Sequence, residues 1–308
     1  MVSRYACPWI CLRYLSEPRH EFNMRPSATA YIYIAPAFAL LLFVLFSPVI
    51  YGFWFTLFRI EYGAPTDFIG LGNYVRLIED PTLLPTLSRS GVFTAACVVF
   101  TIMIAMALAV WINRLPARTA FIVQMVVIVP WIISAVVATL LFRWVFVNDI
   151  GVASYLIQLM GFDAVQPLNN PTGAMVLLVA VSVWKRIGYA VLVLLAGLKS
   201  IPDDYDEAAR IDGANNWQIF RMITLPLLKT PLLLIAIVLT LSTFNTVETP
   251  LVMTGGGPGD ATRILAMDVY ERAFTNYDLG SATALAIVMF AGNILLVMSY
   301  VRLARWQA

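Results

Sequence analysis

Five long stretches of the chain contain no Lys, Arg, Asp or Glu, and this feature constrains the fold most strongly. A helix needs roughly 20 apolar residues to cross the hydrocarbon core of a membrane. The stretches reach or nearly reach that length, and they cover residues 26–58, 90–113, 119–142, 230–247 and 279–301. They predict five membrane-spanning helices.

A sixth candidate span covers residues 173–198 and is interrupted by Lys185 and Arg186. Either cation would be costly in the middle of a bilayer unless it faced protein or water. Adjacent residues of a helix point about 100° apart, so the two side chains cannot simply share one partner. We expect pairing inside the protein, with Glu248 as a candidate partner. The alternative is that one of the cations faces water in a cavity.

The composition supports an all-helical membrane protein. Of the 308 residues, 60% are hydrophobic and only 12% are charged, whereas about a quarter of the residues of a soluble domain are charged. No segment shows the alternating pattern of a membrane β-barrel, and helices satisfy their own backbone groups in lipid. We therefore predict an all-α integral membrane protein with six transmembrane helices in contact with membrane lipid. The net charge of +2 is spread along the loops, so no nucleic-acid partner is expected.

The basic residues of the connections predict the orientation of the spans. Cytoplasmic loops carry an excess of Lys and Arg, and placing the N-terminus inside puts twelve basic residues on that side and five on the other. Both termini are then cytoplasmic, as is the polar loop, residues 199–229, between the fourth and fifth spans. The cytoplasmic set is Arg4, Arg13, Arg19, Arg25, Arg114, Arg118, Lys199, Arg210, Arg221, Lys229, Arg302 and Arg305.

The chain is expected to form one membrane domain, residues 28–305, after a cytoplasmic tail, residues 1–27. The first 23 residues lack the uninterrupted apolar core of a signal peptide. Because Met24 stands directly before Arg25 and the first span, Met24 is an alternative start site.

The polar loop has the signals of two short helices. Ser200 is a candidate N-cap and Pro202 fits the first position of a helix. Gly213 favours a helix stop, because glycine adopts the left-handed conformation at little cost. Asn215 or Asn216 can cap the second helix. The loop is either a connector folded against the lipid headgroups or a protrusion that another protein contacts.

The spacing of residues in this loop, "EAARIDGANNWQIFRMITLP", resembles a known pattern. Glu207, Ala208 and Ala209 are followed by three residues, Gly213, nine residues and Ile223 to Pro226. This resembles the EAA loop of permease subunits of binding-protein-dependent ABC importers. The resemblance implies a type I importer permease fold in which the loop forms coupling helices that sit in a cleft of a cytoplasmic ATPase. It also implies a place in a bacterial inner membrane.

Three further segments are similar to the carbohydrate branch of that family, in its first, maltose and glycerol-phosphate type of permease. They read "FIGLGNYVRLIEDP", "LAGLKSIPDDYDEAARIDGA" and "VMTGGGPGDAT". The implied function is half of a pathway for a sugar or sugar-like solute, with a polyol or glycerol-phosphate-type solute as the alternative. The implied partners are a second permease subunit, an ATPase dimer and an external solute-binding protein.

The residues give no sign of an enzyme. The segment "GGGPGD" lacks the Lys and hydroxyl of a phosphate-binding loop, so the ATPase is expected on a separate subunit. The single histidine, His20, lies in the tail, and no cofactor, metal site or Ser-His-Asp triad is expected. A secondary transporter is the rival class, which would need coupling-ion residues and broken helices in the membrane.

Polar groups inside spans are candidates for the solute pathway, because each is costly in lipid. Asn245 lies in the fifth span, with Phe244 before it and Glu248 after it. In the maltose-type permeases this region lines the sugar site, and an amide beside an aromatic ring suits a polyhydroxylated ligand. The alternative role is a hydrogen bond to the partner permease. Arg143, beside Trp144, is expected to be an interfacial anchor.

Overall fold

The computed structural model describes residues 28–61, 64–147, 151–160 and 166–306. The chain divides into two compact units, Met1–Tyr51 and Gly52–Ala308. The described part of the first unit is helix α1 (Ala28–Phe55) up to residue 51, and residues 52–55 of this helix belong to the second unit. The predicted tail, with His20 and the alternative start Met24, lies outside the described residues.

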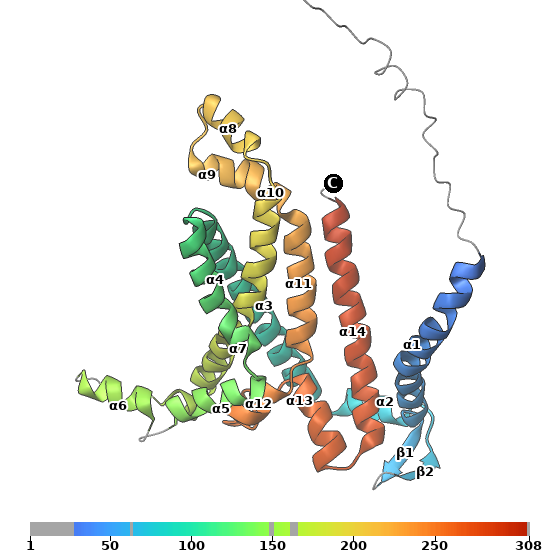
Figure 1. The fold of residues 1–308 in the computed structure, drawn as a ribbon. Helices are drawn as coiled ribbons and strands as arrows, with labels where there is room; N and C mark the ends of the chain where they lie inside the picture. Colours follow the sequence, from blue (N-terminus) through green and yellow to red (C-terminus); the bar gives the residue numbers. More distant parts are fainter. Residues whose placement is uncertain (1–27, 62–63, 148–150, 161–165, 307–308) are drawn as a thin grey trace, which may run out of the picture. The chain divides into compact units, whose positions relative to one another are not determined.

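The second unit is built on a bundle of five helices (Figure 1). Their bounds are α3 (Leu83–Asn113), α4 (Ala117–Ile132), α7 (Pro171–Lys199), α11 (Lys229–Phe244) and α14 (Leu279–Trp306). Helix α7 packs against α3, α4 and α11, and α11 also packs against α3 and α14. Small residues allow the close approach of α4 and α7, as expected between helices in lipid. A Cβ atom on Gly188 would lie 2.6 Å from the carbonyl oxygen of Val127.

The described chain has four helices long and apolar enough to cross a membrane, or up to six if each of two bent pairs is one span. The four lie in α1, α3, α7 and α14. The bent pairs join α4 to α5 (Ala135–Val145) at 94°, and α9–α10 to α11 at 66°. The prediction of a helical membrane protein is thus confirmed, and the six predicted spans are reached when each bent pair is one broken span.

The third predicted span is not one straight helix. It was expected to run from residue 119 to residue 142, but α4 ends at Ile132 and α5 leaves at 94°. Pro130 lies inside the last turn of α4, and a proline removes one helical hydrogen bond. Ile133 and Ser134 are then extended, with ψ angles of 140° and 137°. The uncharged stretch therefore contains a break that its hydropathy does not reveal.

Short elements connect the bundle helices. The connecting helices are α2 (Gly72–Glu79), α6 (Val152–Leu159), η1 (Pro167–Asn169), α8 (Asp204–Ile211), α9 (Asn216–Ile219), α10 (Leu225–Leu227), α12 (Glu248–Met253) and α13 (Leu265–Tyr270). Two π-helical segments, η2 (Phe220–Thr224) and η3 (Glu271–Thr275), continue α9 and α13. The strands β1 (Phe58–Glu61) and β2 (Ala64–Phe68) pair antiparallel, with Phe58 opposite Phe68 and a bulge after Arg59. This hairpin is a small exception to the all-α prediction within the described residues.

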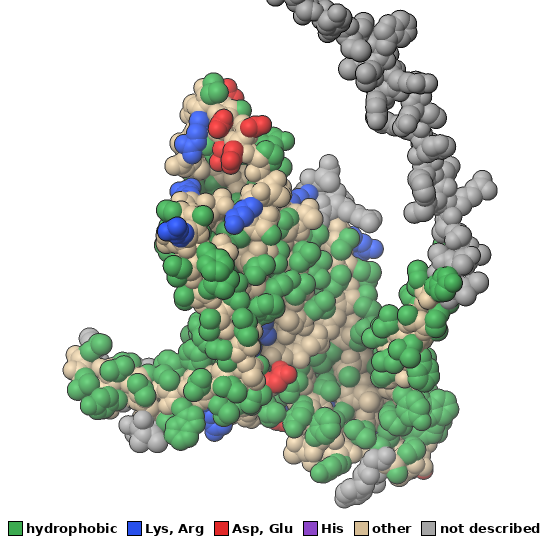
Figure 2. Space-filling model, in the orientation of Figure 1, with side chains coloured by type: hydrophobic (Ala, Val, Ile, Leu, Met, Phe, Trp, Pro, Cys, Tyr) green, Lys and Arg blue, Asp and Glu red, His purple; other side chains and the backbone are tan. Residues whose placement is uncertain are grey.

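The second unit has two chemically different ends. The polar loop, with α8 and α9, projects at one end, here called the loop end, and α2, α5, α12 and α13 lie at the opposite end (Figure 1). Figure 2 shows acidic and basic side chains gathered on the loop end and hydrophobic side chains over the bundle. This distribution matches a bundle embedded in lipid with a hydrated loop outside it.

Candidate functional site

The polar loop folds as two short helices, α8 and α9. Helix α8 begins at Asp204, so Ser200 is not its N-cap and Pro202 lies outside it. Instead Ser200 follows the end of α7, where its Oγ donates to the Gly197 carbonyl at 2.7 Å. The expectation for Ser200 is wrong because α7 continues to Lys199, so Ser200 is the C-cap of α7 and not the N-cap of α8.

The end of α8 depends on Gly213. Its φ of +82° is left-handed, its N–H donates to the Arg210 carbonyl at 3.1 Å, and the N–H of Ala214 donates to the Ala209 carbonyl at 2.9 Å. These are the two hydrogen bonds of a Schellman motif. Asn215 then starts α9 with a capping box that includes Gln218. The chain therefore reverses within a few residues and in a fixed geometry.

This geometry places the predicted coupling residues on the surface. Glu207, Ala208 and Gly213 are exposed and Ala209 is half-buried. Ile211, which sequence analysis does not single out, is 87% exposed at the end of α8. At the base of the loop, Ile219 is buried, and Leu228 belongs to the buried cluster of the bundle. The loop thus presents a small-residue and apolar face while it stays anchored to α11.

A second candidate site is a cavity of about 390 Å³ between the end of α11, α13 and α14. Asn245 is the C-cap of α11, and its Nδ2 donates to the Leu241 carbonyl at 2.8 Å. The Oδ1 of Asn245 accepts a 3.1 Å hydrogen bond from Nδ2 of Asn293 on α14. The lining residues are Asn245, Val247, Ala266, Val269, Ala286, Met289, Phe290 and Asn293. Two carboxamides therefore meet in a cavity whose other lining residues are apolar.

Asn293 is the residue of this cavity that sequence analysis does not single out. Its Oδ1 is buried and has no hydrogen-bond partner among the described residues, although a buried polar atom normally has one. The signal was present in the sequence, because an Asn in the middle of the sixth span is costly in lipid unless it is paired.

The other two predicted pathway residues lie elsewhere. Phe244 is buried in a cluster with Leu77, Leu265 and Leu285, and it does not line the cavity. Glu248 is exposed in the first turn of α12, where the Thr246 hydroxyl donates to its Oε2 at 3.5 Å. The structure therefore brings Asn245 together with Asn293 rather than with Phe244 and Glu248.

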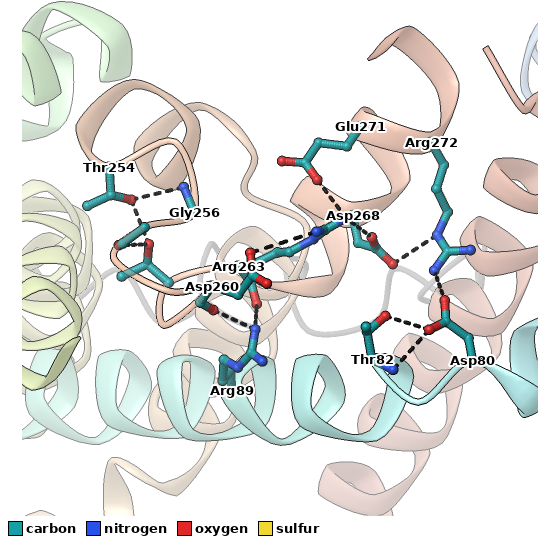
Figure 3. A network of polar contacts seen from close by, with 12 residues as sticks. Asp80, Thr82, Arg89, Thr254, Gly256, Asp260, Arg263, Asp268, Glu271 and Arg272 are labelled. Carbon is teal, nitrogen blue, oxygen red and sulfur yellow. Dashed lines mark hydrogen bonds and ion pairs between the residues drawn. The ribbon is translucent and has the colours of Figure 1, made fainter. Parts of the chain in front are cut away.

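A network of ionic contacts ties the opposite end together (Figure 3). Asp268 of α13 is 1% exposed and accepts hydrogen bonds from Arg263 at 2.8 Å and from Arg272 at 3.0 Å. Arg272 also contacts Asp80 at 2.5 Å, before α3. Burial raises the pKa of Asp80, but hydrogen bonds from Thr82 and Arg272 outweigh it and lower the pKa to about 2. The network joins α13 to the start of α3.

Comparisons with known proteins converge on one family. The family described as "Binding-protein-dependent transport system inner membrane component" matches residues 101–308. The sulfoquinovosyl glycerol transport system permease protein of Agrobacterium fabrum is 33% identical, over 90% of each chain. The trehalose/maltose transport system permease protein of Thermococcus litoralis is 29% identical, over 93% of this chain and 97% of that protein.

One relative and one solved structure extend the comparison. The sn-glycerol-3-phosphate transport system permease protein of Agrobacterium fabrum is 31% identical, over 84% of this chain and 88% of that protein. A bacterial ABC transporter involved in the import of the acidic polysaccharide alginate superposes with a TM-score of 0.79 at 21% identity. That match covers 90% of this chain and 95% of the other, and it shows a shared fold.

Proposed function

The chain belongs to the family of binding-protein-dependent transport system inner membrane components, and from this premise we propose that it forms half of the solute pathway of an ATP-driven importer. It is a multi-pass permease subunit of such a system. A second permease subunit supplies the other half of the pathway. An ATPase dimer and an external solute-binding protein complete the assembly.

The exposed polar loop is the observation that carries this proposal. The Schellman turn at Gly213 fixes the end of α8 and leaves Glu207, Ala208 and Ile211 open to a partner. We expect this surface to dock in a cleft of the ATPase, so that closure of the ATPases moves α8 and α9 as a rigid body. The motion then switches the bundle between two states that ATP and the loaded binding protein favour differently.

The proposed orientation places the loop end in the cytoplasm together with both termini. The described residues at that end include Arg114, Lys199, Arg210, Arg221 and Lys229, which agrees with the excess of basic residues in cytoplasmic loops. The opposite end, with α2 and α13, then faces the binding protein.

We expect the solute to be a sugar or a sugar-like molecule. The carboxamide nitrogens of Asn245 and Asn293 each make one hydrogen bond within the protein and keep a second hydrogen for a hydroxyl oxygen. The lining of this cavity contains no charged residue in the described part of the chain, which favours a neutral solute over a glycerol phosphate. The relative named for trehalose and maltose fits a neutral sugar, and the relative named for sulfoquinovosyl glycerol fits a sugar-like solute.

Co-purification tests the proposal. The tagged chain is extracted from membranes as wild type, Gly213→Asp and Glu207→Lys, and the bound proteins are identified by mass. We expect a second permease and an ATPase with wild type, and loss of the ATPase in both variants. Glu79→Lys, at an exposed site of α2 at the opposite end, is the matched control and should keep the ATPase. A chain that purifies alone, or a loss that Glu79→Lys shares, would contradict the coupling role.

The broken helices call for a separate test against a secondary transporter, since that class also uses discontinuous helices. Uptake of radiolabelled maltose and of sn-glycerol 3-phosphate is measured in cells depleted of ATP while the ion gradients are kept. The importer proposal expects uptake to stop. Uptake that persists would support the secondary transporter.

A further inference from the structure

Three helices, α4, α11 and α12, each have a carbonyl at or near the C-terminal end that accepts a hydrogen bond from a basic side chain of another helix. Lys185 of α7 donates to the carbonyl of Ile133, the C-cap of α4. Arg186 of α7 donates to the carbonyl of Ser242, near the end of α11, at 3.3 Å. Arg143 of α5 donates to the carbonyl of Val252, in the last turn of α12, at 2.9 Å. The three basic residues thus share one kind of partner.

Helix ends in a membrane need such partners. The last four carbonyls of a helix have no intrahelical donor, and lipid offers no water to replace it. Helices α4 and α11 each have 16 residues, a length of about 24 Å against about 30 Å for the hydrocarbon core. Both therefore end inside the membrane, where a cation at the C-terminus also complements the helix dipole.

The position of α7 explains why two adjacent cations are used. Helix α7 packs against both α4 and α11, and adjacent helical residues point about 100° apart. Lys185 therefore reaches the end of α4 while Arg186 reaches the end of α11. Their partners are backbone carbonyls, and no ion pair joins either cation to Glu248 in the described residues.

Arginine suits the second position better than lysine. The Arg186 guanidinium donates from Nη1 to the Ser182 carbonyl at 3.1 Å as well as from Nη2 to the Ser242 carbonyl, and Nε lies 3.5 Å from Oγ of Ser242. The planar guanidinium of arginine can donate hydrogen bonds to carbonyls of both helices at once, whereas a lysine ammonium is a single point charge. Arg186 therefore ties α11 to α7 by more than one contact.

We propose that Lys185 and Arg186 are positioning residues that hold the C-terminal ends of α4 and α11 to α7. Arg186 fixes the end of α11 three residues before Asn245, the C-cap that lines the cavity. Because α7 leads directly into the polar loop, α4, α7 and α11 then move together when that loop moves. This last step rests on the proposed importer function, but the anchoring itself does not.

Hydrogen exchange of the full-length protein, purified with its partner subunits in lipid nanodiscs, tests the anchoring. Lys185→Met should speed amide exchange about tenfold or more in a peptide covering residues 129–146 and leave residues 241–254 unchanged. Arg186→Met should give the reverse pattern. Peptides of α3 serve as the internal reference, and Arg221→Met, an exposed cation of the polar loop, is the matched control.

Conservative variants separate anchoring from general loosening. Lys185→Arg should restore protection of residues 129–146, while Arg186→Lys should restore residues 241–254 only in part, since it loses the planar guanidinium. Unchanged exchange in both peptides, or equal acceleration in both peptides and in α3, would overturn the proposal. The measurement needs no solute and no ATP hydrolysis, so its failure can be told apart from a failure of the importer proposal.

Discussion

Asp268 shows at the scale of one residue how the opposite end is held together. Its buried carboxylate lies between Arg263 and Arg272, so removing its charge weakens a hydrogen bond to each arginine, although each keeps a second carboxylate partner. We predict that Asp268→Asn lowers the free energy of unfolding by about 2 kcal/mol, within the range for hydrogen bonds to charged groups. Thermal unfolding in detergent should show a clear drop in Tm.

The control for this prediction is an exposed ion pair at the same end. Arg76 and Asp278 lie 3.8 Å apart, with side chains 45% and 35% exposed. Asp278→Asn keeps an oxygen for the Ser281 N–H, which Asp278 now accepts at 3.1 Å. Its effect should stay below about 1 kcal/mol, as for other surface pairs. Equal losses in the two variants would show that burial does not set the strength of the network.

The pH dependence of the contact between Asp80 and Arg272 follows from the pKa of Asp80, which is about 2 in the folded protein. An unfolded Asp has a pKa of about 3.9. Because the folded pKa is the lower one, the stabilising contribution is complete above about pH 4 and is lost as the pH falls toward 2. The difference in Tm between wild type and Asp80→Asn should be constant from pH 7 to pH 5 and shrink below pH 4. A difference that already shrinks between pH 7 and pH 5 would contradict this assignment.

Residues with strong backbone requirements were the most predictable from the sequence. Gly213 as a helix stop and Asn215 as a cap are both found in the structure, because their local chemistry determines the turn. Ser200 was mispredicted because capping rules do not say which of two helices a serine belongs to. Asn293 was not singled out, since its contact with Asn245 joins two spans that are distant in the sequence.

At the scale of the element, the polar loop depends on one backbone conformation. Gly213 has a φ of +82° and open space where a Cβ would lie. We predict that Gly213→Ala costs about 1 kcal/mol of loop stability, through backbone strain alone, and weakens ATP-driven uptake. Gly213→Asn should be milder, because Asn adopts this conformation more readily.

Uptake and ATPase co-purification of the two Gly213 variants, measured side by side, check the prediction. The order wild type, then Asn, then Ala supports a role for the turn itself. If the Asn variant is as impaired as the Ala variant or more so, side-chain bulk at the partner surface matters more than the backbone conformation.

The broken spans mark the limit of element-level prediction. An uncharged stretch defines which residues can lie in lipid, but it does not require one continuous helix. Within the stretch from residue 119 to residue 142, Pro130 and two extended residues divide α4 from α5. Lys185 and Arg186 were recognised as costly, but their carbonyl partners could not be inferred because the positions at which α4 and α11 end were unknown.

At the scale of the whole molecule, the two ends of the second unit use their basic residues differently. Among the described residues, the ion pairs lie at the opposite end, where Asp80, Asp268 and Asp278 each contact an arginine. At the loop end, Arg114, Arg221 and Lys229 take part in none of those ion pairs. Unpaired cations next to a span are attracted to the negatively charged cytoplasmic leaflet, so the loop end favours the proposed orientation.

Thiol labelling of membrane vesicles tests that orientation. In a background with Cys7, Cys11 and Cys97 replaced by Ser, a single cysteine is placed at Ile211 in the polar loop or at Asn276 after η3, both exposed sites. A membrane-impermeant maleimide should label Ile211→Cys in inside-out vesicles and Asn276→Cys in right-side-out vesicles. The reverse pattern would place the loop on the outer side, away from cytoplasmic ATP. The coupling role of Glu207 and Gly213 would then be untenable, although the packing of α7 against α4 and α11 would stand unchanged.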